Sequence, residues 1–78
     1  MTFDEWKNEI HSQQYNRERA LALACALTEL YKPGERVSPP EIRKRFAVSE
    51  NVTAPALMRL KAQGLVARAH GRLLRTEK

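Results

Sequence analysis

The chain has 78 residues and 42% hydrophobic content, which suffices for one modest core and therefore for one domain, or one subunit of an oligomer. Its single cysteine, Cys25, excludes an internal disulfide and a cysteine-rich zinc site, and it fits a reducing compartment. No window reaches the roughly 18 apolar residues of a membrane span, and Asp4 and Glu5 stand where a signal peptide needs basic residues, so we expect a cytoplasmic protein without a membrane partner.

The net charge of +5 is distributed unevenly along the chain. Residues 1–35 carry four basic and six acidic side chains, a net charge of −2, whereas residues 36–78 carry ten basic and three acidic ones, a net charge of +7. Such a C-terminal half attracts a polyanion, because Lys and Arg displace the counterions condensed on a nucleic-acid duplex. The alternative interpretation is a basic surface that maintains solubility.

The first predicted helix runs from Phe3 to about Gln13. Thr2 followed three residues later by Glu5 is the pattern of a capping box, in which each side chain accepts a hydrogen bond from the other residue's backbone N–H. Apolar residues then recur at the spacing of one helical face: Phe3, Trp6 and Ile10.

This apolar face allows two interpretations. It packs either on the domain's own core, or against a second copy or another protein as a dimer seam or docking face. We favour the second, because a tryptophan on a helix outside the minimal fold is typical of an interface. Residues 1–15 are accordingly treated as an N-terminal extension of a domain formed by residues 16–78.

The second predicted helix extends from about Arg17 to Tyr31 and ends at Pro33-Gly34, because proline cannot continue the hydrogen-bond ladder. We expect Cys25, close to its apolar face, to be a buried and unreactive thiol, since no helix N-terminus or histidine is expected beside it. The residues of that face share helical spacing: Ala20, Leu23, Ala24, Leu27, Leu30 and Tyr31.

The segment Ser38-Pro39-Pro40-Glu41 predicts the start of a third helix. It combines an N-cap serine, prolines in the first turn where a missing N–H costs nothing, and a glutamate that can complete a capping box. Ile42 and Phe46, four residues apart, predict its buried face, and the helix should end near Ala47-Val48. The preceding Arg36-Val37-Ser38 is a candidate for a very short strand.

A fourth helix is predicted from Ser49 to the capping glycine Gly64. Because of Pro55, the sequence allows two starting points for this helix. Either Ser49 is the N-cap, or a turn covers residues 49–52 and Thr53 is the N-cap, which would place Pro55 in the first turn. In both cases two helices joined by a few residues suggest a helix-turn-helix.

After Gly64 the pattern changes to two short strand-like runs, Leu65-Val66-Ala67-Arg68-Ala69 and Arg72-Leu73-Leu74-Arg75-Thr76. The intervening His70-Gly71 predicts a tight turn with a positive φ at Gly71. The sequence therefore predicts a C-terminal β-hairpin. The fold class expected overall is mainly α with a small β-hairpin.

The order helix, short strand, helix, helix, hairpin resembles a winged helix-turn-helix. The stretch from Val48-Ser49 through Arg59-Leu60 to Gly64-Leu65-Val66 is similar to the recognition helix and first wing strand of GntR-type and MarR-type bacterial transcriptional regulators. The resemblance implies a three-helix core with a wing and a helix that enters a DNA groove. It further implies that three residues face the groove, Glu50, Asn51 and Ala54, and that three lie on or beside the wing, Arg68, His70 and Arg72.

We expect Asn51 to read an adenine edge and Thr53 to contact a phosphate or a thymine methyl, with helix capping as the alternative role of both. The arginines beside the tip should lie on one side of the hairpin and contact phosphates, unless they are ordinary solvated residues. His70 should be a turn residue whose charge can tune the contact. The predicted DNA-binding residues are Arg43, Lys44, Ser49, Asn51, Thr53, Arg59, Lys61, Arg68, His70 and Arg72.

The sequence leaves three classes of function to consider. The first is a transcriptional regulator that occupies double-stranded DNA as a dimer. The second is a winged-helix module that docks on a protein, such as an accessory subunit or a phage-encoded inhibitor of a nucleic-acid-handling complex, and it is favoured by the small Ala54 and by Pro55. An enzyme is disfavoured, because no catalytic pairing, phosphate loop or metal-ligand spacing is present. We expect no cofactor and no metal.

Overall fold

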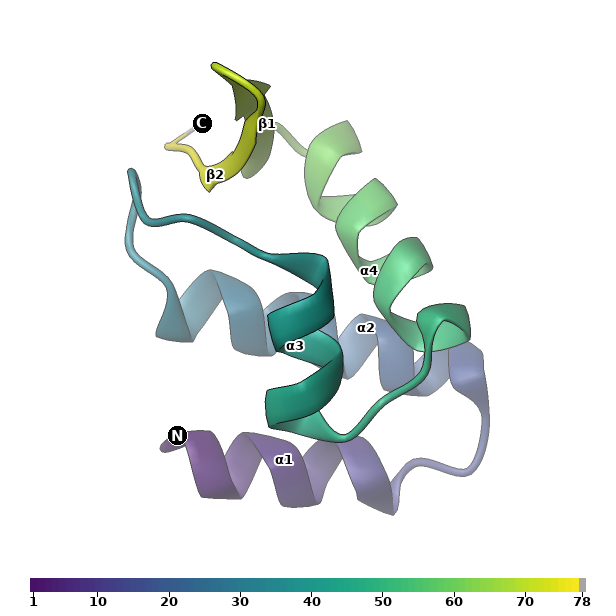
Figure 1. Ribbon diagram of the computed structural model, residues 1–78. Helices are drawn as coiled ribbons and strands as arrows, with labels where there is room; N and C mark the ends of the chain where they lie inside the picture. Colours follow the sequence, from purple (N-terminus) through teal and green to yellow (C-terminus); the bar gives the residue numbers. More distant parts are fainter. Residues whose placement is uncertain (78) are drawn as a thin grey trace.

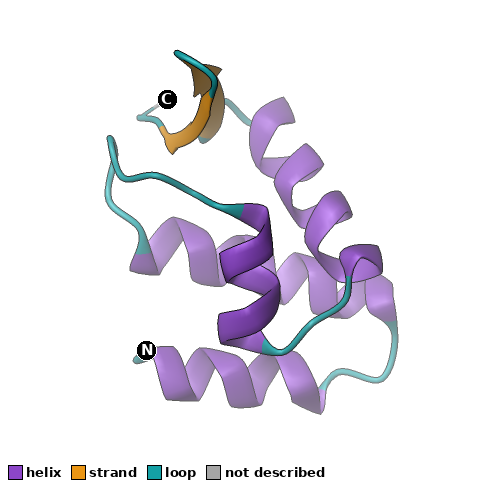
Figure 2. Cartoon of the chain, in the orientation of Figure 1, coloured by secondary structure: helices purple, strands orange, loops and turns teal. Residues whose placement is uncertain are grey.

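The computed structural model describes residues 1–77, which form four helices followed by an antiparallel hairpin (Figures 1 and 2). The expectation of a mainly helical chain with a small hairpin is confirmed in this form. No helix among these residues is long and apolar enough to cross a membrane. The elements are α1 (Phe3–Ser12), α2 (Asn16–Leu30), α3 (Pro39–Phe46), α4 (Glu50–Ala62), β1 (Val66–Ala69) and β2 (Arg72–Arg75).

The helices pack around α2, which contacts both α1 and α4. In Figure 1, α1 and α2 run in opposite directions at the bottom of the molecule, α3 stands in front of α2, and α4 leads up to the hairpin. The hairpin therefore lies at the C-terminal end of α4, away from α1.

All four helices contribute to a single hydrophobic core. The six largest of its fully buried side chains are exposed to 1% or less: Ile10, Leu23, Leu27, Ile42, Phe46 and Leu60. Burying one such side chain contributes about 1.5 to 3 kcal/mol to folding, so the core is the main source of stability. Because Ile10 belongs to it, α1 shares the core of the rest of the domain.

The prediction that Ile10 belongs to a dimer or docking face is therefore wrong, because this residue is fully buried and not available to a partner. Phe3 and Trp6 are half-buried and also pack against the core. The Phe3 ring lies against Phe46, with the ring centroids 4.9 Å apart. The physical reason is simple: α2 and α3 leave an apolar surface uncovered, and the apolar stripe of α1 covers it.

Thr2, Ser38 and Ser49 are N-cap residues as predicted, but of these three only Thr2 makes a side-chain capping hydrogen bond. At α1 the capping box forms, with the N–H of Glu5 donating to Thr2 Oγ1 at 3.2 Å and the N–H of Thr2 donating to Glu5 Oε1 at 2.8 Å. At α3, Ser38 is the N-cap but its side chain makes no capping hydrogen bond, so the predicted second box is absent. Two prolines open α3 and have no N–H, which leaves fewer donors for a cap to satisfy.

Helix α4 begins at Glu50 with Ser49 as its N-cap. The N–H of Thr53 donates to the carbonyl of Ser49 at 3.0 Å, so Thr53 lies inside the helix and the alternative start at Thr53 is wrong. Pro55 accordingly lies in the helix interior rather than in the first turn. Its missing N–H deprives the carbonyl of Asn51 of the usual donor four residues on.

The hairpin has a two-residue turn. Ala69 pairs with Arg72, and both turn residues adopt positive φ, 53° at His70 and 76° at Gly71. Two successive positive φ values are those of a type I′ turn, whose twist suits the strands of a hairpin. The predicted short strand before α3 is present as a single antiparallel bridge between Arg36 and Leu74.

Arg75 fastens the hairpin to the helices, and it is only 6% exposed. Its Nε donates to the carbonyl of Tyr31 at 3.1 Å and its Nη2 to that of Thr28 at 3.2 Å, both at the C-terminal end of α2. Its Nη1 donates to the carbonyls of Leu65 and Thr76, each at 2.7 Å. A positive charge at the end of α2 also complements the helix dipole.

Replacing Arg75 by methionine should destabilise the fold by about 3 kcal/mol, because several carbonyls lose a charged donor in a buried site. Urea unfolding followed by circular dichroism measures this change. Arg72→Met is the matched control, because Arg72 is exposed on the same strand and its loss should cost about 0.5 kcal/mol or less. Equal stability losses in the two variants would contradict the structural role of Arg75.

Trp6, the one tryptophan, belongs to a polar cluster between α1 and α2. The indole N–H of Trp6 donates to Glu29 Oε2 at 2.6 Å, and the ammonium group of Met1 lies 2.5 Å from Glu29 Oε1. The hydrogen bond from the ammonium group, followed by that from Trp6, lowers the pKa of Glu29 below its ordinary value of 4.5. The stabilisation that ionised Glu29 gives the folded state is therefore present above pH 4.5 and is lost as the pH falls through the lowered pKa of Glu29.

We expect the fluorescence of Trp6 to change when the solution is acidified below pH 4.5, as protonated Glu29 loses its interaction with Met1 and weakens as an acceptor for the indole. A fluorescence titration of the folded protein measures this. In Glu29→Gln the transition should disappear, because an amide does not titrate. A transition of the same size in that variant would assign it to another group.

Candidate nucleic-acid interface

Three residues connect α3 to α4, as the sequence predicted. Ala47 takes the left-handed conformation at the end of α3, with φ 54°, and the N–H of Val48 donates to the carbonyl of Arg43 at 3.1 Å. Val48 packs against the core, and Ser49 is the N-cap residue of α4, although its side chain makes no capping hydrogen bond. This tight connection fixes the orientation of α4 relative to α3 and leaves one side of α4 uncovered.

The uncovered side of α4 changes in character along the helix. Asn51 is exposed near its start, Met58 is 70% exposed in its middle, and Arg59 and Lys61 are exposed near its end. Pro55 is also exposed between them. The outward surface of α4 is therefore polar, then apolar, then basic.

Thr53 does not belong to this surface. It is fully buried, and its hydroxyl donates to the carbonyl of Ser49 at 3.0 Å. The predicted contact of Thr53 with DNA is therefore wrong, because helix α4 starts earlier than that prediction assumed and turns the residue inward. Ser49, in contrast, is exposed at the N-cap.

The basic residues of α3 are only partly free. Arg43 forms an ion pair with Glu50 across the connection to α4. Lys44 is exposed, and no ion pair among residues 1–77 includes it. The ion pair weakens the attraction of Arg43 for a phosphate. It also neutralises Glu50, which would otherwise repel a phosphate at the start of α4.

The register of the hairpin separates its two exposed arginines. Arg68 pairs with Leu73 and Arg72 pairs with Ala69, so the two side chains project from opposite faces. The prediction that both arginines lie on one side of the hairpin is therefore wrong. With a two-residue turn the strand register differs by one position from the register that this prediction needs, and a shift of one position moves a side chain to the opposite face. Arg36, opposite Leu74 on the other side of β2, shares the face of Arg72.

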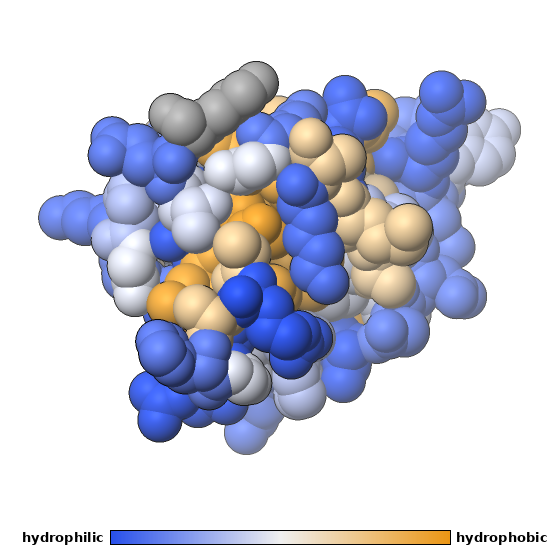
Figure 3. Space-filling model, turned by 90° about the horizontal axis from the view of Figure 1, so that it is seen from above, coloured by the Kyte–Doolittle hydropathy of each residue, from blue (hydrophilic) through white to orange (hydrophobic). Residues whose placement is uncertain are grey.

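From residue 51 to residue 76 the chain contains no acidic side chain. Arg75 is buried in this stretch, but four basic side chains are exposed and enter no ion pair among the described residues: Arg59, Lys61, Arg68 and Arg72. They cover the end of α4 and the hairpin, with the exposed His70 at the tip. Figure 3 looks onto this end and shows hydrophilic side chains around a central area of apolar surface.

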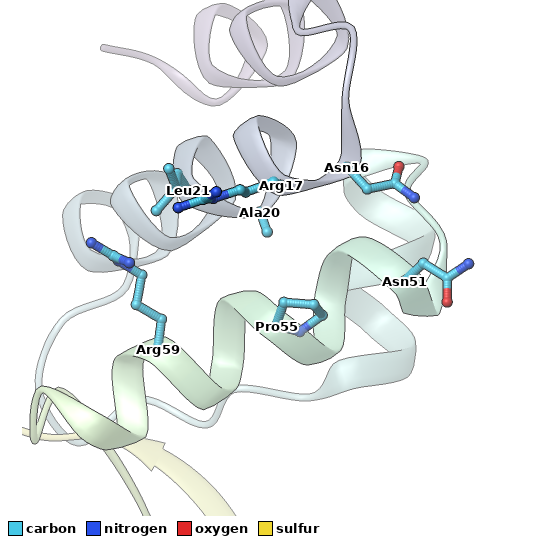
Figure 4. A pocket seen from close by; sticks show the side chains of 7 residues that line it. All are labelled: Asn16, Arg17, Ala20, Leu21, Asn51, Pro55 and Arg59. Carbon is cyan, nitrogen blue, oxygen red and sulfur yellow. The ribbon is translucent and has the colours of Figure 1, made fainter.

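A groove of about 500 Å³ lies beside α4, between it and the first half of α2 (Figure 4). No single stretch of sequence indicates it, because its walls come from segments some 35 residues apart. For the same reason the sequence does not single out Asn16, Arg17 and Leu21 as surface residues of interest. The groove is lined by Asn16, Arg17, Ala20, Leu21, Asn51, Pro55 and Arg59.

Cys25 is exposed, which corrects the expectation of a buried thiol. Its neighbours Ala24 and Ala26 on α2 are buried, so the cysteine lies just outside the edge of the buried face. The two histidines lie in different parts of the molecule: His11 Nε2 is 2.7 Å from the carbonyl of Phe46, at the end of α3, whereas His70 is in the hairpin turn. Residues 1–77 contain no cluster of His, Cys, Asp or Glu that could hold a metal ion.

In comparisons with known proteins, no family model, no curated protein and no solved structure matches this chain.

Pro55→Ala should raise the free energy of unfolding by about 1 to 2 kcal/mol, because alanine restores the hydrogen bond to the carbonyl of Asn51 and an interior proline costs a helix about 3 kcal/mol, partly offset by the gain in unfolded-chain entropy. Urea unfolding measures the change. Lys61→Ala, an exposed change on the same helix, should alter it by less than about 0.5 kcal/mol. Unchanged stability in Pro55→Ala would mean that α4 is already relaxed around the proline.

Proposed function

We propose that this protein binds double-stranded DNA as a winged helix-turn-helix, with α4 as the helix that approaches the major groove and the hairpin as the wing. One observation carries the proposal: the end of α4 and the hairpin form an exposed basic surface with no acidic residue from position 51 to position 76. Unpaired basic side chains on one end of a small domain are the electrostatic footprint of a nucleic-acid partner.

The arrangement of the elements supports the same proposal. Helix, short bridged segment, two helices with a three-residue connection and a hairpin follow in the order expected of a winged helix. The 13 residues of α4 correspond to a length of about 20 Å, and the major groove of B-DNA, about 12 Å wide, admits such a helix. The hairpin follows α4 after three residues and so stays close to its end.

The proposed mode of binding is dominated by phosphates. Arg59 and Lys61 reach the backbone from the end of α4, and Arg68 and Arg72, on opposite faces of the hairpin, reach two different strands. Asn51 is the side chain of α4 best suited to reading a base edge, and the apolar Met58 is suited to a thymine methyl. Occupation of duplex DNA by such a protein blocks or recruits the transcription machinery.

A second candidate function, a winged helix that docks on a protein, is favoured by one specific observation. The middle of α4, where a DNA reader usually offers polar side chains, offers Pro55 and a Met58 that is 70% exposed. Exposed apolar side chains at such a position are typical of protein interfaces. The basic surface makes DNA the better-supported partner.

The test is a fluorescence-anisotropy titration of a random-sequence duplex at about 50 and 200 mM salt. Binding should weaken steeply with salt, because bound Lys and Arg release counterions. Each of Arg68→Ala and Arg72→Ala should lower the slope of log K against log salt concentration by about one, and the double variant by about two.

Lys7→Ala is the matched control, since Lys7 lies on α1, at the far end of the molecule from the hairpin (Figure 1). It should leave both affinity and salt slope unchanged. The absence of duplex binding at low salt, or equal losses for Lys7 and the hairpin arginines, would contradict the proposal and favour the protein-docking candidate.

A further inference from the structure

The groove between α2 and α4 has an apolar middle. Ala20 and Leu21 come from α2 and Pro55 comes from α4. Leu21 is 37% exposed and the ring of Pro55 is exposed, although both are apolar. Covering these two side chains would remove apolar surface from water, which contributes about 25 cal/mol per Å².

One end of the groove is positively charged. Figure 4 shows the side chains of Arg17, from α2, and Arg59, from α4, reaching toward the same end. Both residues are exposed, and no ion pair in the described part of the chain uses either of them. Two guanidinium groups on facing helices, with no carboxylate among the residues that line the groove, are complementary to an anionic group.

The other end of the groove offers amides. Asn16 and Asn51 lie there, on opposite walls (Figure 4). An asparagine side chain both donates and accepts hydrogen bonds, as a peptide group does. Because Pro55 has no N–H, the backbone carbonyl of Asn51 also lacks its intrahelical donor and can accept one from a ligand.

From this arrangement we propose that the α2–α4 groove binds an acidic, extended segment of a partner protein. A carboxylate of the segment pairs with Arg17 and Arg59, an apolar side chain covers Leu21 and Pro55, and the segment's backbone bonds to Asn16 and Asn51. The volume of about 500 Å³ lies within the range of small binding pockets, about 300 to 1,000 Å³, and suits a few extended residues better than a whole helix.

The apolar middle distinguishes this ligand from a nucleic acid. A sugar-phosphate backbone would satisfy the arginines but would bring charged oxygens against Leu21 and Pro55 at a desolvation cost. A protein segment supplies the carboxylate and the apolar side chain together. The inference therefore does not depend on DNA binding, although Arg59 and Asn51 belong to both surfaces.

The experiment uses the full chain and fluorescent peptide pools of nine residues with a central leucine flanked by random aspartate and glutamate. A matched pool carries asparagine and glutamine in place of the acids. The acidic pool should bind at least tenfold more tightly than the neutral pool at moderate salt. Arg17→Glu and Leu21→Ser should each weaken the acidic pool by about tenfold.

Lys61→Glu is the matched control, because Lys61 is an exposed basic residue of α4 that does not line the groove. It should change peptide affinity by less than about twofold. All three positions are exposed, so circular dichroism and thermal unfolding should show intact folds.

Two results would overturn the inference. In the first, the acidic pool fails to bind; if Arg17→Glu then also abolishes duplex binding, the groove belongs to nucleic acid. In the second, Lys61→Glu weakens binding of the acidic pool as much as Arg17→Glu does, which would indicate general attraction to a basic surface. Duplex binding measured in parallel tests the proposed function separately, because it depends on the hairpin arginines and not on Leu21.

Discussion

The guanidinium group of Arg75 joins parts of the chain that are far apart in sequence, and the placement of the hairpin depends on it. It donates to carbonyls at the end of α2, at the start of the hairpin and after β2, and the backbone N–H of Arg75 donates to the carbonyl of Glu35 at 2.9 Å. The N–H of Lys32 bonds instead to the Glu35 side chain, so the carbonyl of Thr28 depends on this arginine. A two-stranded hairpin is marginal in water by itself, and this attachment, with the buried Val66 and Leu73, holds it against the helices.

The burial of Arg75 also affects which positive charges are available to a partner. Arg75 has the same charge as its neighbours in sequence, but its burial removes it from the surface available to a partner, as the ion pair with Glu50 partly removes Arg43. Arg45 is used within the fold as well, since its guanidinium lies 4.8 Å from the centre of the Phe3 ring and donates to the hydroxyl of Tyr31 at 3.0 Å. Among residues 51–77, the basic side chains that remain exposed lie at the end of α4 and on the hairpin. Net charge along the sequence thus overstates the exposed basic surface.

Local signals predicted most of the fold. The capping box at Thr2, the two prolines at the start of α3 and Gly71 in the hairpin turn each act within a few residues, so their effects can be derived from the sequence. The failures have tertiary causes. The burial of Ile10 and the exposure of Cys25 depend on how neighbouring helices are rotated, and the separation of Arg68 from Arg72 depends on a register that one residue in the turn can change. The α2–α4 groove and the role of Arg75 exist only once distant segments have packed.

We propose that the end of α4 and the hairpin form one DNA-binding surface on a fold fastened by Arg75. The most direct test is an NMR titration of the ¹⁵N-labelled protein with a random-sequence duplex at low salt, which reports on every amide at once. We expect chemical-shift changes at Asn51, along the second half of α4 and through the hairpin, with α1 unaffected. Changes centred on α1, or no changes at all, would contradict it.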